Sequence, residues 1–377
     1  MMTDPISWDI AAKVASRVAG RDPFAASYLY ESLQPDFEEL TAQAEGLVTA
    51  ETGLRPLLGP ARARVTDRPG WVRANIASFR RLLRPVLNRF EEKLAESAGS
   101  PMGRFVQPVG RTITGAQIGT LLGWMSTRVL GQYDSLLMED DKPEEQDLVY
   151  YVGPNILALE KRFAFPPREF RLWIALHEVT HRAQFTGVPW MRDHFASLVE
   201  ATVSAADPDP KRFLAALGKA IDLIRQGRNP LDDGLVALLA TPEQAETLDK
   251  VSGLMSLLEG HGDVTMDRAA KDLIPNAERF SRVLRERRGQ ASAPVKLLQQ
   301  AIGLDAKMRQ YEAGEQFIAA VEAIGGPALL ARAWEAPERL PTIGEIREPQ
   351  RWVDRMAATP SGGWTVAVEA ALAAAAS

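Results

Sequence analysis

The sequence contains no cysteine in 377 residues and only four histidines. The absence of cysteine excludes disulfide bonds, a cysteine nucleophile and thiolate metal ligands. Any metal ion must therefore be bound by histidine or by oxygen ligands. Signatures of other chemistries are missing too, because there is no glycine-rich phosphate loop before a helix, no S-x-x-K and no G-x-S-x-G motif. No cofactor other than a metal has support in the residues.

Long apolar runs are also scarce. The first residues, MMTDPISWDIAAK, lack the charged start and the apolar core of a signal peptide. No run approaches the roughly 18–20 apolar residues of a spanning helix, and the alanine-rich end is interrupted by Glu369. We therefore expect a cytoplasmic protein that does not enter the membrane.

Composition and charge indicate a large folded protein. Hydrophobic residues make up 46% of the chain, charged residues 25%, and the formal net charge is −5. This charge gives no electrostatic reason to bind nucleic acid or an anionic membrane. The length exceeds the roughly 250–300 residues at which single cores usually stop growing, so one lobed domain or two domains are expected.

An acidic run at residues 139–145 is the best candidate boundary, because such a run is typical of a solvated loop. We predict an N-terminal helical region at 1–140, a catalytic region at 141–347 and a C-terminal tail at 348–377. The sequence predicts no oligomeric state.

Hydrophobic periodicity predicts a mainly α, multi-helical fold with few short strands. Residues 71–97 form an amphipathic stretch with a kink expected at Pro85, and residues 211–226 form another. Residues 110–137 carry glycine at 115, 119 and 123, a small-residue face that allows close helix approach. Residues 148–152, LVYYV, are the clearest strand. That strand is either a substrate edge or a core strand.

The stretch LWIALHEVTHRAQF at residues 172–185 contains polar residues whose pattern core packing does not explain. On a helix, His177 and His181 share one face, where side chains four residues apart are neighbours. Two imidazoles at that separation can bind one metal ion, and Glu178 can reach a water on that ion. Together they form H-E-x-x-H, the zinc-hydrolase helix. The alternative is two surface histidines beside a helix glutamate.

The flanking residues favour a helix at this position. Pro166, Pro167 and Glu169 suit a helix start, since proline is tolerated and acids are favoured in the first turn. An apolar stripe on the face opposite the histidines is formed by Leu172, Leu176, Val179 and Ala183. The ligand face can therefore line a cavity while the opposite face packs.

A zinc site needs a third protein ligand. Gly187 occupies the position of the third histidine in a metzincin, and His194 belongs to the next helix. The better segment is LMSLLEGHGDVTMD at residues 254–267, where Glu259 and Asp263 share a helix face and His261 points elsewhere. Glu259 is the preferred ligand, because Asp263 one turn on can accept the ring N–H of a ligating histidine.

This pattern resembles the gluzincin metallopeptidases, in which H-E-x-x-H is completed by E-x-x-x-D on a later helix. The resemblance implies that Glu259 is the third ligand and that Asp263 holds His177. Two residues depart from the pattern. Leu258 stands where thermolysin-like enzymes have Asn, and Arg182 stands where an uncharged residue is usual. The support of His181 is therefore unassigned.

More widely, IALHEVTHRAQF, SLLEGHGDVTMD and LDAKMRQYEAGEQF resemble the type 2 zincin-like metallopeptidases, over most of residues 65–356. One branch of that multi-helical family is named for an association with deazaflavin coenzyme biosynthesis. The family implies a hydrolase but no particular substrate.

The sequence thus predicts a zinc-dependent hydrolase acting on a peptide or other amide, with Glu178 as general base. His261, Tyr311 and Arg309 are candidates to stabilise an oxyanion or contact substrate, although ordinary helix-surface roles explain each of them as well. Two alternatives stay open: a zincin scaffold that binds partners, and perhaps a metal, without turnover, and a metal-free helical scaffold.

Overall fold

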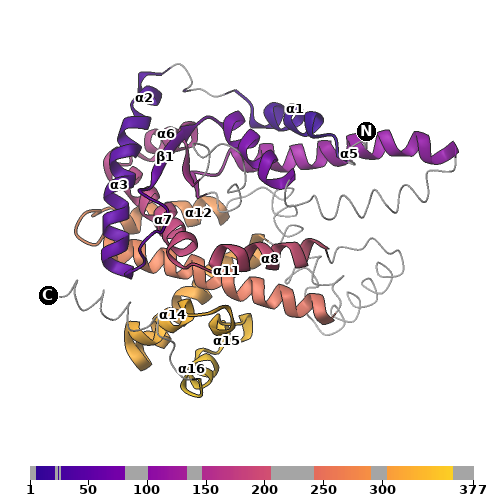
Figure 1. The fold of residues 1–377 in the computed structure, drawn as a ribbon. Coiled ribbons are helices and arrows are strands. Elements are labelled where there is room, and N and C mark those ends of the chain that lie inside the picture. Colours follow the sequence, from indigo (N-terminus) through magenta and orange to yellow (C-terminus); the bar gives the residue numbers. More distant parts are fainter. Residues whose placement is uncertain are drawn as a thin grey trace. The chain divides into compact units, whose positions relative to one another are not determined.

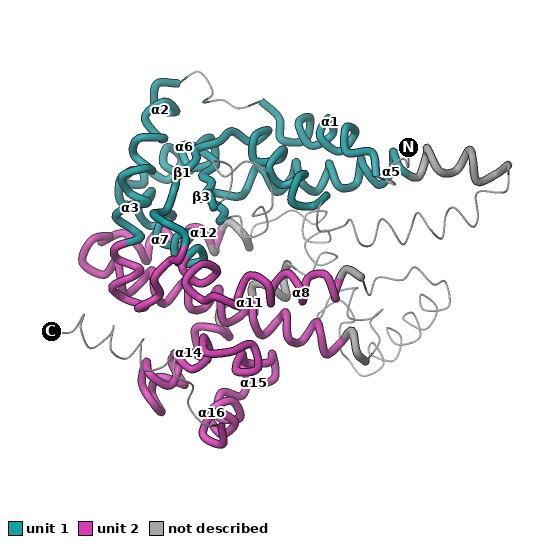
Figure 2. The backbone as a smooth tube through the Cα atoms, viewed as in Figure 1, with its two compact units in different colours: residues 1–45, 58–182 teal, residues 46–57, 183–377 magenta. Residues whose placement is uncertain are grey.

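The computed structural model describes residues 6–21, 24, 27–80, 101–133, 147–204, 242–289 and 304–359. It divides into two compact units, shown in Figure 2. Unit 1 comprises residues 1–45 and 58–182, and unit 2 comprises residues 46–57 and 183–377. The chain changes units three times, inside helices α3 (Leu33–Thr52) and α7 (Pro167–Gly187) and, between them, at residues 57–58. The boundary expected near residue 140 lies outside the described residues and stays a prediction.

Unit 1 contains a small sheet, labelled in part in Figure 1. Its strands are β1 (Arg62–Thr66), β2 (Gly131–Tyr133) and β3 (Leu148–Val152), in the order β1-β3-β2. β1 pairs with β3 in parallel and β2 pairs with β3 antiparallel. All five β3 residues are buried. The predicted strand is confirmed, but its interpretation as a substrate edge is wrong, because strands occupy both of its edges.

Besides most of α3 and α7, unit 1 contains the helices α1 (Trp8–Ala19), α2 (Tyr28–Glu31), α5 (Pro101–Ser126) and α6 (Gly153–Phe163), with residues 68–80 also helical. α1 packs directly on α5. Cβ atoms at Gly115, Gly119 and Gly123 would lie only 2.4–2.5 Å from backbone oxygens of α1 or its N-cap. The predicted small-residue face is therefore a close helix contact, which a larger side chain would force apart.

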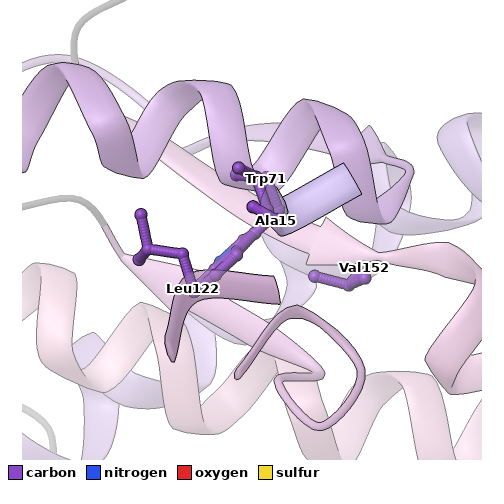
Figure 3. Close-up of a cluster of buried hydrophobic side chains, with 5 residues drawn as sticks. Ala15, Trp71, Leu122 and Val152 are labelled. Atoms are coloured by element: carbon purple, nitrogen blue, oxygen red, sulfur yellow. The ribbon is translucent and has the colours of Figure 1, made fainter. Parts of the chain in front are cut away.

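A buried apolar cluster joins this helix pair to the sheet. It contains Ala15, Trp71, Val72, Leu122 and Val152, and Figure 3 labels four of them. Burying a large apolar side chain stabilises a fold by about 1.5–3 kcal/mol. The cluster fixes the end of β3 against α1 and α5.

Unit 2 is built from helices. They are α8 (Met191–Ser204), α11 (Pro242–Ala269), α12 (Ala277–Gly289), α14 (Leu304–Ala331), α15 (Ile343–Arg347) and α16 (Pro349–Ala357), with 3-10 turns η2 (Arg332–Trp334) and η3 (Pro337–Arg339). α11 packs against α8, α14 and α15. α11 and α14 meet through glycines, since a Cβ at Gly314 would lie 2.0 Å from the carbonyl oxygen of Ser256. With the small sheet of unit 1, these helices confirm the mainly α fold.

One described segment, Ala313–Trp334, is long and apolar enough to cross a membrane by length and composition. The expectation that no run reaches this length is wrong by that measure, because only Glu315, Glu322 and Arg332 carry charge in the segment. Its helix is broken at Gly326, where φ is 68°. Phe317, Ile318 and Val321 are fully buried within unit 2, as in the core helix of a folded domain.

Several predicted features lie outside the described residues. They are the kink at Pro85, the acidic run at 139–145, the helix at 211–226 and the end of the chain from residue 360. The predicted tail begins at 348, and its first part is helix α16.

Candidate metal centre

The two histidines of the H-E-x-x-H motif lie one turn apart on α7, as their spacing predicts. The Nε2 atoms of His177 and His181 are 3.2 Å apart, and their rings meet nearly at right angles with centroids 4.6 Å apart. Both side chains are half-buried. Two imidazole nitrogens that converge in this way can be ligands of one metal ion.

The opposite face of α7 is anchored in the protein interior. Leu172, Leu176, Val179 and Ala183 are at most 5% exposed. The predicted apolar stripe is therefore confirmed. Because the helix is fixed by its own packing, the orientation of the histidine face is set by the fold.

Glu178 is buried at 8% exposure and lies against strand β2. Its Oε2 atom accepts a hydrogen bond of 3.0 Å from the backbone N–H of Tyr133. A Cβ atom at Gly131 would lie 2.5 Å from Cγ of Glu178 and 2.7 Å from Oε1. The carboxylate thus occupies space that exists only because residue 131 is glycine.

Arg182 follows His181 and is completely buried. Its guanidinium donates to Asp147 over 3.0 and 2.7 Å and to Glu45 over 2.5 Å. It also donates to the carbonyl oxygens of Leu58 and Gly59. Burial lowers the pKa of Arg182, but the hydrogen bonds and charges of Asp147 and Glu45 outweigh burial and raise it overall. The charge that departs from the gluzincin pattern is therefore fully paired.

Helix α11 carries the predicted third ligand, Glu259, whose side chain is buried at 6% exposure. The last turn of α7 contacts α11 within unit 2. Nε2 of Gln184 donates to the carbonyl oxygen of Leu258 over 2.9 Å and lies 3.0 Å from Nδ1 of His261. Because an amide nitrogen only donates, Nδ1 of His261 accepts, and the ring proton lies on Nε2. The His261 ring also meets Trp334 edge-on.

Helix periodicity connects Gln184 to the histidines. Positions 177, 181 and 184 are separated by four and three residues, so they share one face of the unbroken helix α7. Gln184 binds the backbone of the residue immediately before Glu259. The ligand atoms of His177, His181 and Glu259 lie within 4.8 Å of one another. Two imidazole nitrogens and one carboxylate oxygen are a donor set that zinc takes, with its fourth position left to water.

The remaining predicted residues have mixed outcomes. Asp263 is half-buried one turn beyond Glu259, and its assignment as the partner of His177 stays a prediction. His194 lies on α8 with its ring against Trp190. Arg309 and Tyr311 belong to α14, but their side chains lie outside the described residues. The roles of His261, Arg309 and Tyr311 as substrate contacts stay predictions.

Sequence reasoning missed three contributors to this region. Gln184 could have been found from its helical spacing to the histidines. Tyr133 is a buried aromatic residue, and its backbone N–H also binds Glu178. Asp147, which pairs with Arg182, follows an acidic run and carries no signal that distinguishes it from neighbouring loop acids.

Comparison with known proteins identifies a matching family and a related solved structure. A family model described as zincin-like metallopeptidase matches residues 6–353. A crystal structure from Chloroflexus aurantiacus, described as that of a "putative hydrolase with a novel fold", shares 30% sequence identity. The match covers 94% of this chain and 100% of that one, with a TM-score of 0.68. No curated protein matches the sequence. The family model spans nearly the whole chain, including both helices that carry the His177, His181 and Glu259 group, and the protein belongs to the zincin-like metallopeptidase family.

Proposed function

We propose that the protein is a zinc-dependent hydrolase that cleaves peptide or other amide bonds. The observation that carries the proposal is the convergence of His177, His181 and Glu259, with ligand atoms within 4.8 Å of one another. Zinc is the metal that best suits two imidazoles and a carboxylate in a cysteine-free chain. Family membership supports metallohydrolase chemistry in general.

A bound zinc ion would supply a Lewis acid that polarises the scissile carbonyl and lowers the pKa of water toward about 7. Glu178, next in the chain to His177, accepts a proton from the attacking water and passes it to the leaving amine nitrogen. His261, with its ring proton on Nε2, is a candidate donor to the developing oxyanion. Arg309 and Tyr311 are candidates to bind the substrate backbone or a carboxylate. Asp263 is the candidate acceptor for a ring N–H of His177.

The proposal also covers the cellular compartment and the class of substrate. We place it in the cytoplasm, acting on a peptide or amide substrate rather than on nucleic acid or a membrane. The net charge of −5 supports the exclusion of polyanionic partners.

Metal analysis and a peptide-library assay test the proposal together. The wild type is expected to contain one zinc per chain and to lose hydrolysis on chelation, with recovery on adding zinc. His177→Ala and Glu259→Ala are expected to lose the zinc. Glu178→Gln is expected to keep the zinc and lose turnover, because a neutral amide cannot accept the proton. His194→Ala is the matched control, since it removes a histidine of α8 and should leave both measurements unchanged.

The possible outcomes separate the proposal from its alternatives. Zinc without chelator-sensitive hydrolysis of any library peptide would favour the non-catalytic scaffold. Absence of zinc from the wild type would favour the metal-free scaffold. Full zinc occupancy in His177→Ala would contradict the ligand assignment.

A further inference from the structure

Helix α7 presents two pairs of functional side chains rather than one. His177 and His181 form the first pair, four residues apart. Glu178 and Arg182 form the second, also four residues apart and shifted by one position. One residue of an α-helix corresponds to a rotation of about 100°. The second pair therefore lies on a neighbouring face, and its contacts include Tyr133 of strand β2 and Asp147, the residue before strand β3.

A closed series of contacts within unit 1 connects Glu178 to Arg182. The backbone N–H of Tyr133 donates to Glu178 over 3.0 Å, and the hydroxyl of Tyr133 donates to Asp147 over 3.1 Å. Asp147 in turn accepts two hydrogen bonds from Arg182. Tyr133 thus contacts Glu178 through its backbone and the ion pair through its ring. The helix itself completes the series between residues 178 and 182.

Burial restrains each member of the series. Tyr133 and Asp147 are each 8% exposed. The Arg182 side chain is fully buried and donates to two carboxylates and two backbone carbonyl oxygens. Buried, mutually satisfied polar groups rigidify their surroundings, because displacing one leaves another without its partner. Asp147 also adopts a left-handed backbone conformation, with φ of 53°, which places its carboxylate beside both α7 and β2.

We propose that Tyr133, Asp147 and Arg182 are positioning residues that hold the Glu178 carboxylate in the orientation needed for proton transfer. This inference rests on the proposed function. A flexible glutamate populates several rotamers, and proton transfer requires one that keeps the carboxylate within hydrogen-bond reach of the water. The ion pair fixes the ring of Tyr133, the ring fixes strand β2, and the backbone N–H of that strand fixes the carboxylate. Arg182 therefore acts on the general base from the same helix, through the sheet.

The chain offers a direct probe of this arrangement, because it contains only six tyrosines. Selective 15N-tyrosine labelling of the full chain gives six backbone amide signals, and the signal lost in Tyr133→Phe identifies Tyr133. Hydrogen exchange of that amide reports its bond to Glu178. Exchange at Tyr151, on the central strand β3, serves as the internal reference for overall stability.

Three variants test the series. Glu178→Ala removes the acceptor and should increase exchange of the Tyr133 amide at least tenfold relative to Tyr151. Asp147→Asn should increase it at least threefold, and asparagine tolerates the left-handed backbone at this position. Tyr133→Phe removes only the hydroxyl that binds Asp147, and it replaces Asp147→Asn as the test if that variant does not fold. In Tyr133→Phe, 15N-phenylalanine labelling follows hydrogen exchange of the same backbone amide.

Tyr151→Phe is the matched control. It also removes a buried tyrosine hydroxyl, here bonded to Thr41 over 2.8 Å, on a strand of the same sheet. It should lower stability without changing hydrogen exchange of the Tyr133 amide. Because Tyr151 is replaced in this variant, the Tyr150 amide serves as its internal reference. On a peptide found by library screening, Tyr133→Phe should lower kcat about tenfold and change KM less than twofold. Tyr151→Phe should change neither.

The inference and the proposed function fail in different ways. Unchanged Tyr133 exchange in both Asp147→Asn and Tyr133→Phe overturns the positioning role, even if zinc and hydrolysis are found. Equal loss of kcat in Tyr133→Phe and Tyr151→Phe also overturns it, since the effect would then be general destabilisation. If the wild type binds no zinc but the exchange results hold, the proposed function fails while the positioning contacts stand.

Discussion

Gly131 lies directly against the carboxylate of Glu178, closer than any residue with a side chain could approach. A Cβ atom there would lie 2.5 Å from Cγ, 2.8 Å from Cδ and 2.7 Å from Oε1 of Glu178. The glycine therefore sets the space for the predicted general base, in the same strand whose backbone donates to it.

Gly131→Ala is expected to displace the Glu178 carboxylate by about 1 Å. A misplacement of that size can lower a catalytic rate by about 100-fold. The fold and zinc content should survive, since the displaced atoms belong to a flexible side chain. Steady-state hydrolysis and zinc analysis measure the two effects. The control is Gly46→Ala, where an added Cβ meets nothing within 4 Å. An unchanged rate in Gly131→Ala would remove this contact from the mechanism.

Gln184→Leu is expected to weaken zinc binding about 10-fold, in the range found for residues that orient metal ligands. It removes the amide that binds the Leu258 carbonyl and His261 within unit 2. Leaving those buried acceptors unsatisfied should also cost about 1–3 kcal/mol of stability. Competition with a chromogenic chelator measures the affinity. Gln350→Leu is the matched control, because the Gln350 amide bonds Asp354 at an exposed position. Equal effects of the two substitutions would argue against a role for Gln184.

Gly314→Ala is expected to destabilise unit 2 by about 3 kcal/mol or more, at the upper end of the cost of overpacking. The added Cβ would lie 2.0 Å from the backbone oxygen of Ser256 on α11, and a helix backbone cannot move aside as a side chain can. Urea unfolding measures the loss. A stability loss below about 0.5 kcal/mol would show that α11 and α14 do not pack this closely in solution.

The hydrogen bonds of Glu345 predict that part of the folding stability is lost at low pH. Burial alone raises its pKa, but hydrogen bonds from Arg355 and from the backbone and side chain of Thr342 lower it below the ordinary value of 4.5. A carboxyl group with a depressed pKa contributes stability that is fully present above pH 4.5 and is lost as the pH falls through the folded-state pKa. The Tm of wild type should therefore exceed that of Glu345→Gln at pH 7, and the difference should shrink below pH 4.5. A difference that is constant from pH 7 to pH 3 would contradict the assignment.

The sequence predicts the helices of this protein and the placement of its two motif histidines better than its sheet. Local spacing is sufficient to place His177 and His181 on one helix face and to identify the glycine face of α5. The strand at 148–152 is also visible, since it is a continuous apolar run. β1 was not predicted, because RARVT is short, contains two arginines and pairs with residues 86 positions later in the chain.

The surroundings of Glu178 could not be predicted for the same reason. The contacts of Tyr133, Asp147 and Arg182 join strand β2 and the residue before strand β3 to helix α7, across 35 to 45 residues of chain. Arg182 was noted only as a departure from the gluzincin pattern. Its partners depend on tertiary packing, which neither residue spacing nor composition encodes.

The exchange of the chain between units inside α3 and α7 has a consequence for dissection of the protein. Of the three places where the chain changes units, only residues 57–58 lie outside helices. A protease that cuts at loops finds no linker at residues 45–46 or 182–183, because both positions lie within helices. Truncation at either place would sever a helix and, at the second, separate His181 from Gln184. Fragments cut at these two positions are therefore expected to fold poorly. Reassembly of the protein from two co-expressed halves should require cuts at other positions.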